Sequence, residues 1–272
     1  MSMLKTLVCT GAFGLAACEA GAGSELAIRV YGEEFIESGI PASQFDDGWA
    51  VTFDRFLINL GAIEVSEDGA SAALAEPAFQ VFDLAAPSAG EGHAMFASEV
   101  PAGAYSATRY KILPAGGDSL AGNAAAGDVA MMKSGGFSVF VSGTAKKGGA
   151  GKTFAWGWQT ATSYEHCESQ AVIEAGKPGV VQVTIHGDHL FLDDLFSETP
   201  MVLFGLAAQA DDDGDGDGEI TQAELQAVDL RPLANYQVGS TGITDLWRFL
   251  EHLTTSLGHI DGERHCEAIR EQ

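Results

Sequence analysis

Short segments with alternating apolar and polar side chains fill residues 25–190, and this pattern constrains the fold more than any other feature. The segments are ELAIRVYG, GWAVTFDRFLINLGAIEV, AFQVFDL, YSATRYKIL, GGFSVFVSGTA, KTFAWGWQT and GVVQVTIHG. Successive side chains of a strand point to opposite faces of a sheet, so this alternation predicts strands with one buried face. Gly-rich or Pro-containing turns such as VPAGAY, PAGGD and KKGGAG separate the segments. We therefore predict about seven to nine strands in an antiparallel β-sandwich.

The pattern changes to helical spacing in residues 191–272. Thr199 followed by Pro200 has the form of an N-cap and a proline at the first helical position. A shorter helix is predicted over residues 222–229, and a third over 244–257, where leucines form one stripe. The predicted fold class is therefore mainly β with an α-helical C-terminal part, in which a small helical subdomain follows the sandwich.

An acidic loop, residues 213–224, lies between the first two predicted helices. Its spacing places Asp213, Asp215 and Asp217 at positions 1, 3 and 5, Gly218 at 6, Glu219 at 7, Ile220 at 8, Thr221 at 9 and Glu224 at 12. The loop resembles the EF-hand loop at every diagnostic position. That resemblance implies a calcium ion held by Asp213, Asp215, Asp217, the Glu219 carbonyl, Thr221 through water, and the Glu224 carboxylate.

The alternative interpretation of this loop is a solvated run of acidic charge. Such a run would not require an isoleucine and a glutamate at fixed offsets. We find no second loop of this kind in the sequence. A lone hand in an exported protein is similar to dockerin-like and other extracellular modules, in which calcium is structural and binds at about 10⁻⁴–10⁻³ M.

Residues 1–18, MSMLKTLVCTGAFGLAAC, have the features of an export signal. Lys5 supplies the positive charge, and an apolar stretch too short to span a bilayer follows. LAAC resembles the bacterial lipobox, which implies that Cys18 is lipidated and that residues 19–24 form a flexible tether. The alternative is a plain signal peptide cleaved near Ala17. The expected location is the bacterial cell envelope, on the periplasmic or outer-membrane surface, with the membrane as partner through the lipid.

Only Cys167 and Cys266 remain outside the signal and the lipobox. An even pair in an oxidising compartment predicts a disulfide. This bridge would close a loop of about 100 residues, which the chain-entropy model values at up to about 4.7 kcal/mol. The alternative is two free thiols.

A group of histidines suggests a transition-metal site. His186, Asp188 and His189 lie together at a predicted strand end, and a disulfide would bring His166 near His265. Imidazole nitrogen suits zinc and copper, so the group could bind either ion. The alternative is unrelated surface histidines, because His186 and His189 point to opposite faces of a strand unless the glycine between them breaks the pleat. His93, His252 and His259 are assigned no role.

Composition and motifs exclude several functions. With 38 acidic and 14 basic residues, the net charge of −24 repels nucleic acid, and no nucleic-acid partner is expected. The segment KKGGAGKT does not match a phosphate-binding loop, and we predict a hairpin there. Neither a G-x-S-x-G elbow nor an H-E-x-x-H helix occurs, so no enzyme is predicted. Trp156 and Trp158 share one strand face, either as core or as a platform for sugar rings.

The order of lipobox, sandwich with a VPAGAY turn, and helical tail with one calcium loop resembles uncharacterised bacterial lipoproteins. Those proteins are built on immunoglobulin- or transthyretin-like sandwiches. The resemblance implies a non-enzymatic calcium-binding envelope lipoprotein whose sandwich binds an envelope protein or a small ligand. One alternative is a periplasmic copper- or zinc-binding protein that uses the histidines. A second is a carbohydrate-binding module that uses the tryptophans.

Overall fold

The computed structural model describes residues 23–67 and 71–271 of the chain. The signal peptide, Cys18 and most of the tether lie outside this part. The strands are β1 Ser24–Tyr31, β2 Ala50–Ser66, β3 Leu74–Glu76, β4 Gln80–Asp83, β5 His93–Val100, β6 Gly103–Ile112, β7 Leu120–Ala121, β8 Val139–Lys147, β9 Ala150–Trp158, β10 Thr162–Ile173, β11 Gly179–Ile185, β12 Glu219–Ile220, β13 Gly258–Ile260 and β14 Glu267–Arg270. The helices are α1 Glu33–Glu37, α2 Ala126–Gly135, α3 Gly205–Asp213, α4 Gln222–Ala227 and α5 Leu246–Leu253, with short 3₁₀ turns at Asp188–Phe191 (η1) and Thr254–Ser256 (η2). No helix among these residues is long and apolar enough to cross a bilayer.

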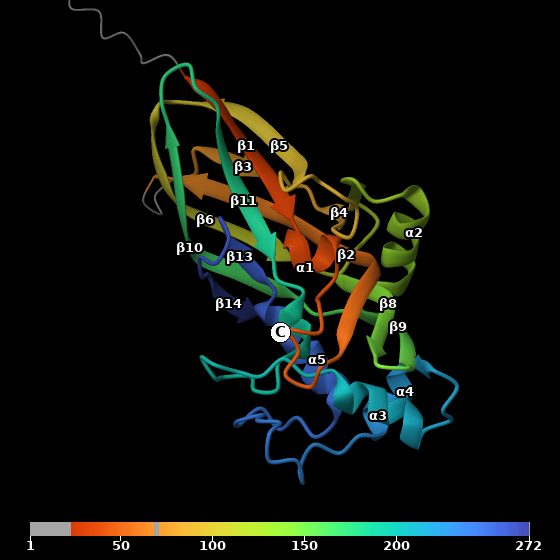
Figure 1. Cartoon of the computed structure of the whole chain (residues 1–272). Helices are drawn as coiled ribbons and strands as arrows, with labels where there is room; N and C mark the ends of the chain where they lie inside the picture. The colour runs from red at the N-terminus through yellow and green to blue at the C-terminus, as the bar shows by residue number, and fades with distance from the viewer. Residues whose placement is uncertain (1–22, 68–70, 272) are drawn as a thin grey trace, which may run out of the picture.

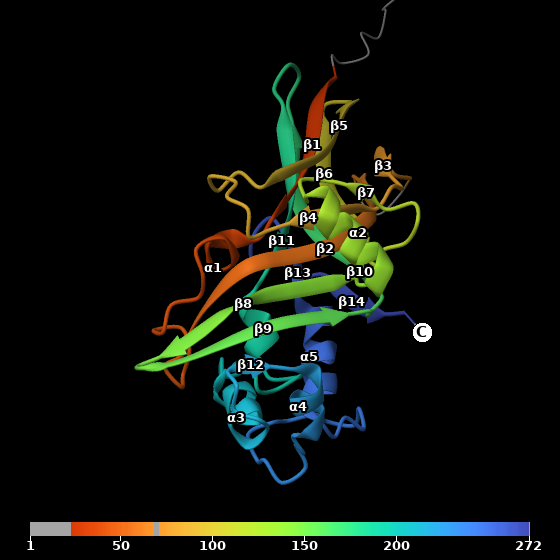
Figure 2. The ribbon, with the colours of Figure 1, turned by 90° about the vertical axis from the view of Figure 1, so that its right-hand side faces the viewer.

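The described strands form two sheets (Figures 1 and 2). The small sheet has the order β13-β11-β1-β5, and the large sheet has the order β12-β9-β8-β2-β6-β10-β14, with β3, β4 and β7 at its side. The prediction of a mainly β fold is confirmed. The prediction of an antiparallel arrangement throughout is wrong, because β1 pairs in parallel with β11, β12 with β9, and β4 with β7. Alternation identifies a strand but carries no information about the direction of its neighbour.

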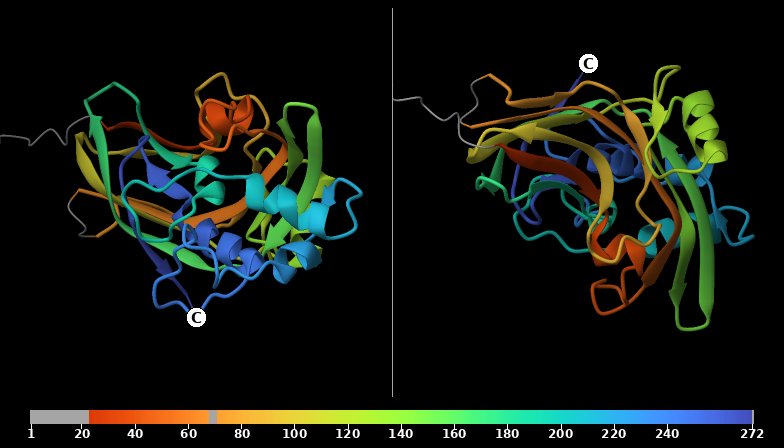
Figure 3. Two further views of the ribbon diagram at one scale, coloured as in Figure 1. Left: turned by 60° about the horizontal axis from the view of Figure 1, so that its bottom comes forward. Right: turned by 90° about the horizontal axis from the view of Figure 1, so that it is seen from above.

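Both sheets contribute apolar side chains to one core. In β1, Leu26, Ile28 and Val30 are fully buried, as the alternating pattern predicts. In β2 the alternation is interrupted by a register shift between Phe53 and Arg55, which changes the face on which the following residues lie. A second, smaller cluster joins Val129 and Met132 of α2 to Leu57 of β2. α2 lies on the outer side of the large sheet (Figure 3).

Two long strands lie in segments for which no strand was predicted. β10 carries small or polar buried residues such as Cys167, Ser169 and Ala171 between exposed polar ones, so its apolar signal is weak. β5 likewise buries few large side chains. The VPAGAY segment forms the turn between β5 and β6. Tyr105 of this segment is buried and donates a 2.8 Å hydrogen bond to the Pro101 carbonyl. The KKGGAGKT segment forms the β8–β9 hairpin as predicted.

The first tail helix begins later than the Thr199–Pro200 signature predicts. α3 begins at Gly205, because the Asp47 carboxylate accepts hydrogen bonds from the backbone N–H groups of Phe204 at 2.9 Å and Gly205 at 2.6 Å. This cap comes from a distant part of the chain, so no local pattern could reveal it. The three tail helices gather at one end of the molecule beside the β8–β9 hairpin (Figures 1 and 2). The tail also returns β12 and β14 to the large sheet and β13 to the small one.

Candidate metal centres

The predicted calcium loop connects two helices. α3 ends at Asp213 and α4 begins at Gln222, so loop positions 2 to 9 lie between them. Thr221 and Glu224 form a capping box at the start of α4: Thr221 Oγ1 accepts the Glu224 N–H at 3.3 Å, and Glu224 Oε2 accepts the Thr221 N–H at 2.8 Å. Gly218 has φ of +93°, a conformation that favours glycine at the sharp turn. The loop is therefore bounded by two helices, one ending at Asp213 and one beginning at Gln222.

The loop is docked on the edge of the large sheet. Glu219 and Ile220 form β12, which pairs in parallel with Thr153 and Phe154 of β9. The Thr153 N–H donates to the Gly218 carbonyl at 2.8 Å, and Trp156 Nε1 donates to the Ile220 carbonyl at 2.8 Å. The Ile220 side chain is buried. The short strand β12 thus finds its hydrogen-bond partners in β9 of the large sheet.

Three carboxylates converge at the loop, and they are not the same set of residues as the predicted calcium ligands. Asp215, Asp217 and Asp211 offer oxygens that all lie within 4.8 Å of one another. The predicted ligand Asp213 instead accepts a 3.1 Å hydrogen bond from Gln209 at the end of α3. Glu224 Oε1 lies 3.5 Å from the Asp215 backbone nitrogen, next to the converging group.

This arrangement fits a hard cation. The Asp215 carboxylate accepts the Asp217 N–H at 3.2 Å, and the Asp217 carboxylate accepts the Glu219 N–H at 2.8 Å. These contacts hold the carboxylates in place at the loop, where each keeps lone pairs free for an ion. Oxygen donors in a flexible loop are the ligands that calcium prefers. Glu219 and Thr221, which were also predicted as ligands, lie in the same loop. They are not part of the group of converging carboxylates.

A buried ion pair attaches the end of α3, just before the acidic loop, to β9. The Lys152 ammonium contacts the carboxylate of Asp211 and lies 2.6 Å from that of Asp212. The Asp211 side chain is fully buried, and that of Lys152 is 9% exposed. The hydrogen bond from Lys152 holds the pKa of Asp211 below its usual value, and the same bond raises the pKa of Lys152. The sequence assigned neither residue a role, because their partnership depends on the tertiary fold.

The second candidate centre is a cluster of four histidines, which we call the histidine cluster: His186, His189, His259 and His265. The ring centroid of His186 lies 5.0 Å from that of His189 and 4.2 Å from that of His259. His259 lies 5.2 Å from His189 and 5.3 Å from His265. The predicted participation of His186, His189 and His265 in one group is therefore compatible with the fold.

A break in the pleat brings His186 and His189 together. β11 ends at Ile185, Gly187 has helical backbone angles of −73° and −28°, and η1 begins at Asp188. The chain therefore turns between the two histidines, and their rings stack with an interplanar angle of 30°. A continuous strand would have directed them to opposite faces.

Membership of the histidine cluster differs from the prediction at two positions. His259, which was assigned no role, enters because β13 pairs with the end of β11, with His259 opposite Thr184. His166, predicted as a ligand, lies outside: its side chain is 84% exposed, and its nearest charged partner is Glu267 at 3.9 Å. In the sequence, His259 and His265 are separated only by the turn IDGER. This short spacing is the only local signal that could have predicted that these two histidines lie together.

Acidic groups border the histidine cluster. Glu33 Oε2 lies 3.5 Å from His186 Nδ1, and Glu33 has a left-handed φ of 55°, which is uncommon for a residue other than glycine. Ligand atoms of Asp188, His186 and His189 lie within 4.8 Å of one another, as do those of Glu33, His186 and Glu263. Burial, reinforced by the adjacent imidazoles, lowers the pKa of His259 to about 3, and burial also lowers the pKa of His189. These two rings are therefore neutral near pH 7, the form in which imidazole binds a metal.

The predicted disulfide forms between Cys167 of β10 and Cys266, the residue next to His265. It joins the large sheet to the segment that carries His265. Trp156 and Trp158 are each about 1% exposed and pack in the core, where Trp158 stacks on Trp247 at 5.1 Å. Neither indole is open to a ligand, so the pair belongs to the core and does not form a platform for sugar rings.

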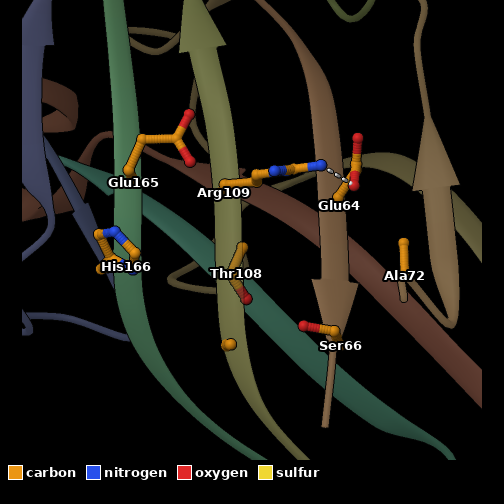
Figure 4. A pocket seen from close by; sticks show the side chains of 8 residues that line it. Glu64, Ser66, Ala72, Thr108, Arg109, Glu165 and His166 are labelled. Carbon is orange, nitrogen blue, oxygen red and sulfur yellow. Dashed lines mark hydrogen bonds and ion pairs between the residues drawn. The ribbon is translucent and has the colours of Figure 1, made fainter. Parts of the chain in front are cut away.

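Figure 4 shows a recess on the large sheet that includes His166. Its volume is about 100 Å³, and its lining includes Arg109, which pairs with Glu64 at 2.5 Å. Glu165 and His166 come from β10, and Thr108 and Arg109 from β6. The recess is too small for an organic ligand of ordinary size. It therefore does not serve as the candidate site.

No family model, curated protein or solved structure matches the chain. Within residues 23–67 and 71–271, the fold and the side-chain geometry define a β-rich protein with one disulfide and several groups of residues suited to metal binding.

Proposed function

We propose that the chain is a non-enzymatic calcium-binding lipoprotein of the bacterial cell envelope, in which calcium orders the junction between α3, α4 and the large sheet. One observation carries the proposal: a helix–loop–helix with EF-hand spacing has converging carboxylates and is docked through β12 onto β9. Under this proposal the two sheets act as a sandwich, and the tail acts as a helical subdomain fastened to it.

Electrostatics supports a bound cation at the loop. Acidic side chains at residues 211, 212, 213, 215, 217, 219 and 224 lie within a short segment, and Lys152 is the basic group paired with the first two. Like charges this close destabilise one another in the absence of a cation. A divalent ion would relieve that repulsion and would fix the loop on which Ile220 and β12 depend. Calcium suits the site better than magnesium, because magnesium demands strict octahedral geometry and keeps its waters.

The lipid anchor and the partner are further parts of the proposal. Cys18 would carry the lipid, and the tether would place the molecule at the envelope surface. A groove of about 520 Å³ lined by β6, β10 and Arg264 offers room for a small ligand or for a segment of an envelope protein. Exposed Val172 provides an apolar contact in this groove. Labelling cells with radioactive palmitate tests the anchor, which predicts incorporation into the wild type and none into Cys18→Ser.

Calcium binding is tested by thermal unfolding and isothermal titration of the purified full-length chain in detergent. We expect 1 to 5 mM calcium to raise the melting temperature relative to chelator by several degrees, as binding to the native state alone requires. Asp217→Asn/Glu224→Gln should abolish both the heat of binding and the thermal shift. Asp118→Asn, an exposed carboxylate far from the loop in sequence, is the matched control and should retain both. Equal melting of the wild type with calcium and with chelator would contradict the proposal.

A further inference from the structure

The histidine cluster is assembled from three separate segments. His186 follows the end of β11 and His189 lies in the adjoining η1, His259 lies in β13, and His265 lies in the turn before β14. His186 is 5% exposed and His259 is 6% exposed. Imidazoles rarely gather in a core without a reason, because each must find partners for its ring nitrogens.

Two buried atoms at the histidine cluster have no hydrogen-bond partner within the described part of the chain. They are Nδ1 of His259 and Oδ1 of Asp188. A buried nitrogen or oxygen without a partner costs about 1–3 kcal/mol. Both atoms are of a kind that binds metal ions, and both belong to residues that neighbour His186 and His189. A bound ion would satisfy them, whereas an empty cluster leaves them unpaired.

Interactions around the rings orient them as in metal sites. His189 Nδ1 lies 2.8 Å from the Ser256 carbonyl, so Nδ1 carries the proton and Nε2 keeps its lone pair. His186 Nδ1 lies 3.5 Å from a Glu33 carboxylate oxygen. Histidine ligands commonly donate their second N–H to a carbonyl or a carboxylate in this way.

The separations of the rings suit one ion. Imidazoles that bind a single zinc ion through nitrogen at about 2.0–2.1 Å in a tetrahedron have ring centroids roughly 5 Å apart. The ring centroids of His186, His189 and His259 lie 4.2 to 5.2 Å from one another, and the ring of His265 lies 5.3 Å from that of His259. Ligand atoms of His186, Asp188 and His189 lie within 4.8 Å of one another.

The donor set indicates the class of the ion. Imidazole nitrogens with a nearby carboxylate suit borderline divalent ions, zinc and copper(II), whereas copper(I) prefers thiolate or thioether sulfur. Cys167 and Cys266 are joined in the disulfide and offer no thiolate. Hard calcium prefers oxygen, so the histidine cluster and the calcium loop would select different ions.

We propose that His186, Asp188 and His189, with His259 beside them, bind one zinc or copper(II) ion. This site shares no residue with the proposed calcium loop and lies next to η2, whose Ser256 carbonyl contacts His189. The ion would fasten the end of β11, η1 and β13 to one another.

The test uses the full-length chain purified in detergent without a histidine tag, stripped with chelator and dialysed. Isothermal titration with zinc chloride, and separately with copper(II) buffered by glycine, should give one ion per chain. The spectrum of the copper form by electron paramagnetic resonance should show nitrogen hyperfine coupling. We expect His186→Gln and His259→Gln each to weaken zinc binding by at least 100-fold. His166→Gln is the matched control, because it removes a histidine outside the cluster, and it should leave the affinity unchanged.

Two measurements keep the proposal open to refutation. Near-ultraviolet circular dichroism of the glutamine variants establishes that they are folded, and should a single variant unfold, the other and His189→Gln serve in its place. The calcium-loop variant Asp217→Asn/Glu224→Gln should bind zinc as the wild type does, so the two proposals fail separately. Absence of binding tighter than about 10 µM, binding of calcium in preference to zinc, or an equal loss in His166→Gln would overturn the transition-metal site.

Discussion

Trp156 Nε1 donates a 2.8 Å hydrogen bond to the carbonyl of Ile220, which joins the core of the large sheet to the acidic loop at residues 213–224. The indole is buried, and it packs on Phe154 with a centroid distance of 4.6 Å. The loop is therefore held by the same side chain that fills the core, and its position depends on the packing of β9.

Replacing Trp156 by Phe tests this connection. The variant leaves the Ile220 carbonyl without this donor and puts a smaller ring in the core, so we expect a loss of about 2–3 kcal/mol in the free energy of unfolding. Calcium affinity should also fall, because the loop loses its anchor. Urea unfolding and calcium titration measure the two effects. A variant that loses stability but keeps the calcium affinity of the wild type would show that the hydrogen bond does not position the loop.

Lys152 is expected to matter most when calcium is absent. Lys152→Met leaves the buried Asp211 carboxylate without its ammonium partner, and breaking a buried pair costs about 3–5 kcal/mol. Urea unfolding in chelator should show a loss in this range, and Lys152→Met/Asp211→Asn should recover much of it. Lys177→Met, which removes an exposed pair with Glu174, is the control and should change stability by less than about 1 kcal/mol.

The disulfide is expected to stabilise the fold. Cys167 and Cys266 are 99 positions apart in the sequence, so their bond restricts a long segment of the unfolded chain. Cys167→Ser/Cys266→Ser should lower the free energy of unfolding by about 2–4 kcal/mol. A thiol reductant should lower the stability of the wild type similarly and leave the double variant unchanged. Equal stability of the reduced and oxidised wild type would contradict this prediction.

Buried tyrosines are expected to limit stability at high pH. Tyr110 and Tyr164 stack with centroids 4.7 Å apart, and burial raises the pKa of both phenols above the ordinary value of 10.0. The unfolded chain loses these phenol protons near pH 10, whereas the native chain keeps them. The free energy of unfolding is therefore unaffected by these two groups below pH 10 and falls as the pH rises above 10.

Phenolate absorbance at 295 nm, followed together with near-ultraviolet circular dichroism, measures this effect. The two buried phenols should titrate only as the native signal is lost. Tyr110→Phe/Tyr164→Phe should move the alkaline midpoint to higher pH. Ionisation of all tyrosines near pH 10 with the native signal intact would contradict the prediction.

Local patterns identified much of the fold. The alternation of Leu26, Ile28 and Val30 predicted a strand with one buried face, and the glycines of KKGGAGKT predicted a hairpin. The spacing of the acidic loop predicted two helix boundaries, at the end of α3 and the start of α4. β10 was missed, because residues such as Ser169 and Ala171 become buried only through their neighbours in the sheet.

The candidate centres divide along the same line. The sequence by itself determined that Asp215, Asp217 and Glu224 share one loop, because short spacing fixes proximity through the backbone. Only the structure decided that the chain turns at Gly187, so that the rings of His186 and His189 meet. It also decided that His259 joins those histidines and that His166 does not. The physical reason is strand pairing: the contact of β13 with β11 joins residues far apart in the chain, and hydrogen-bond register, which no local pattern encodes, sets which side chains meet.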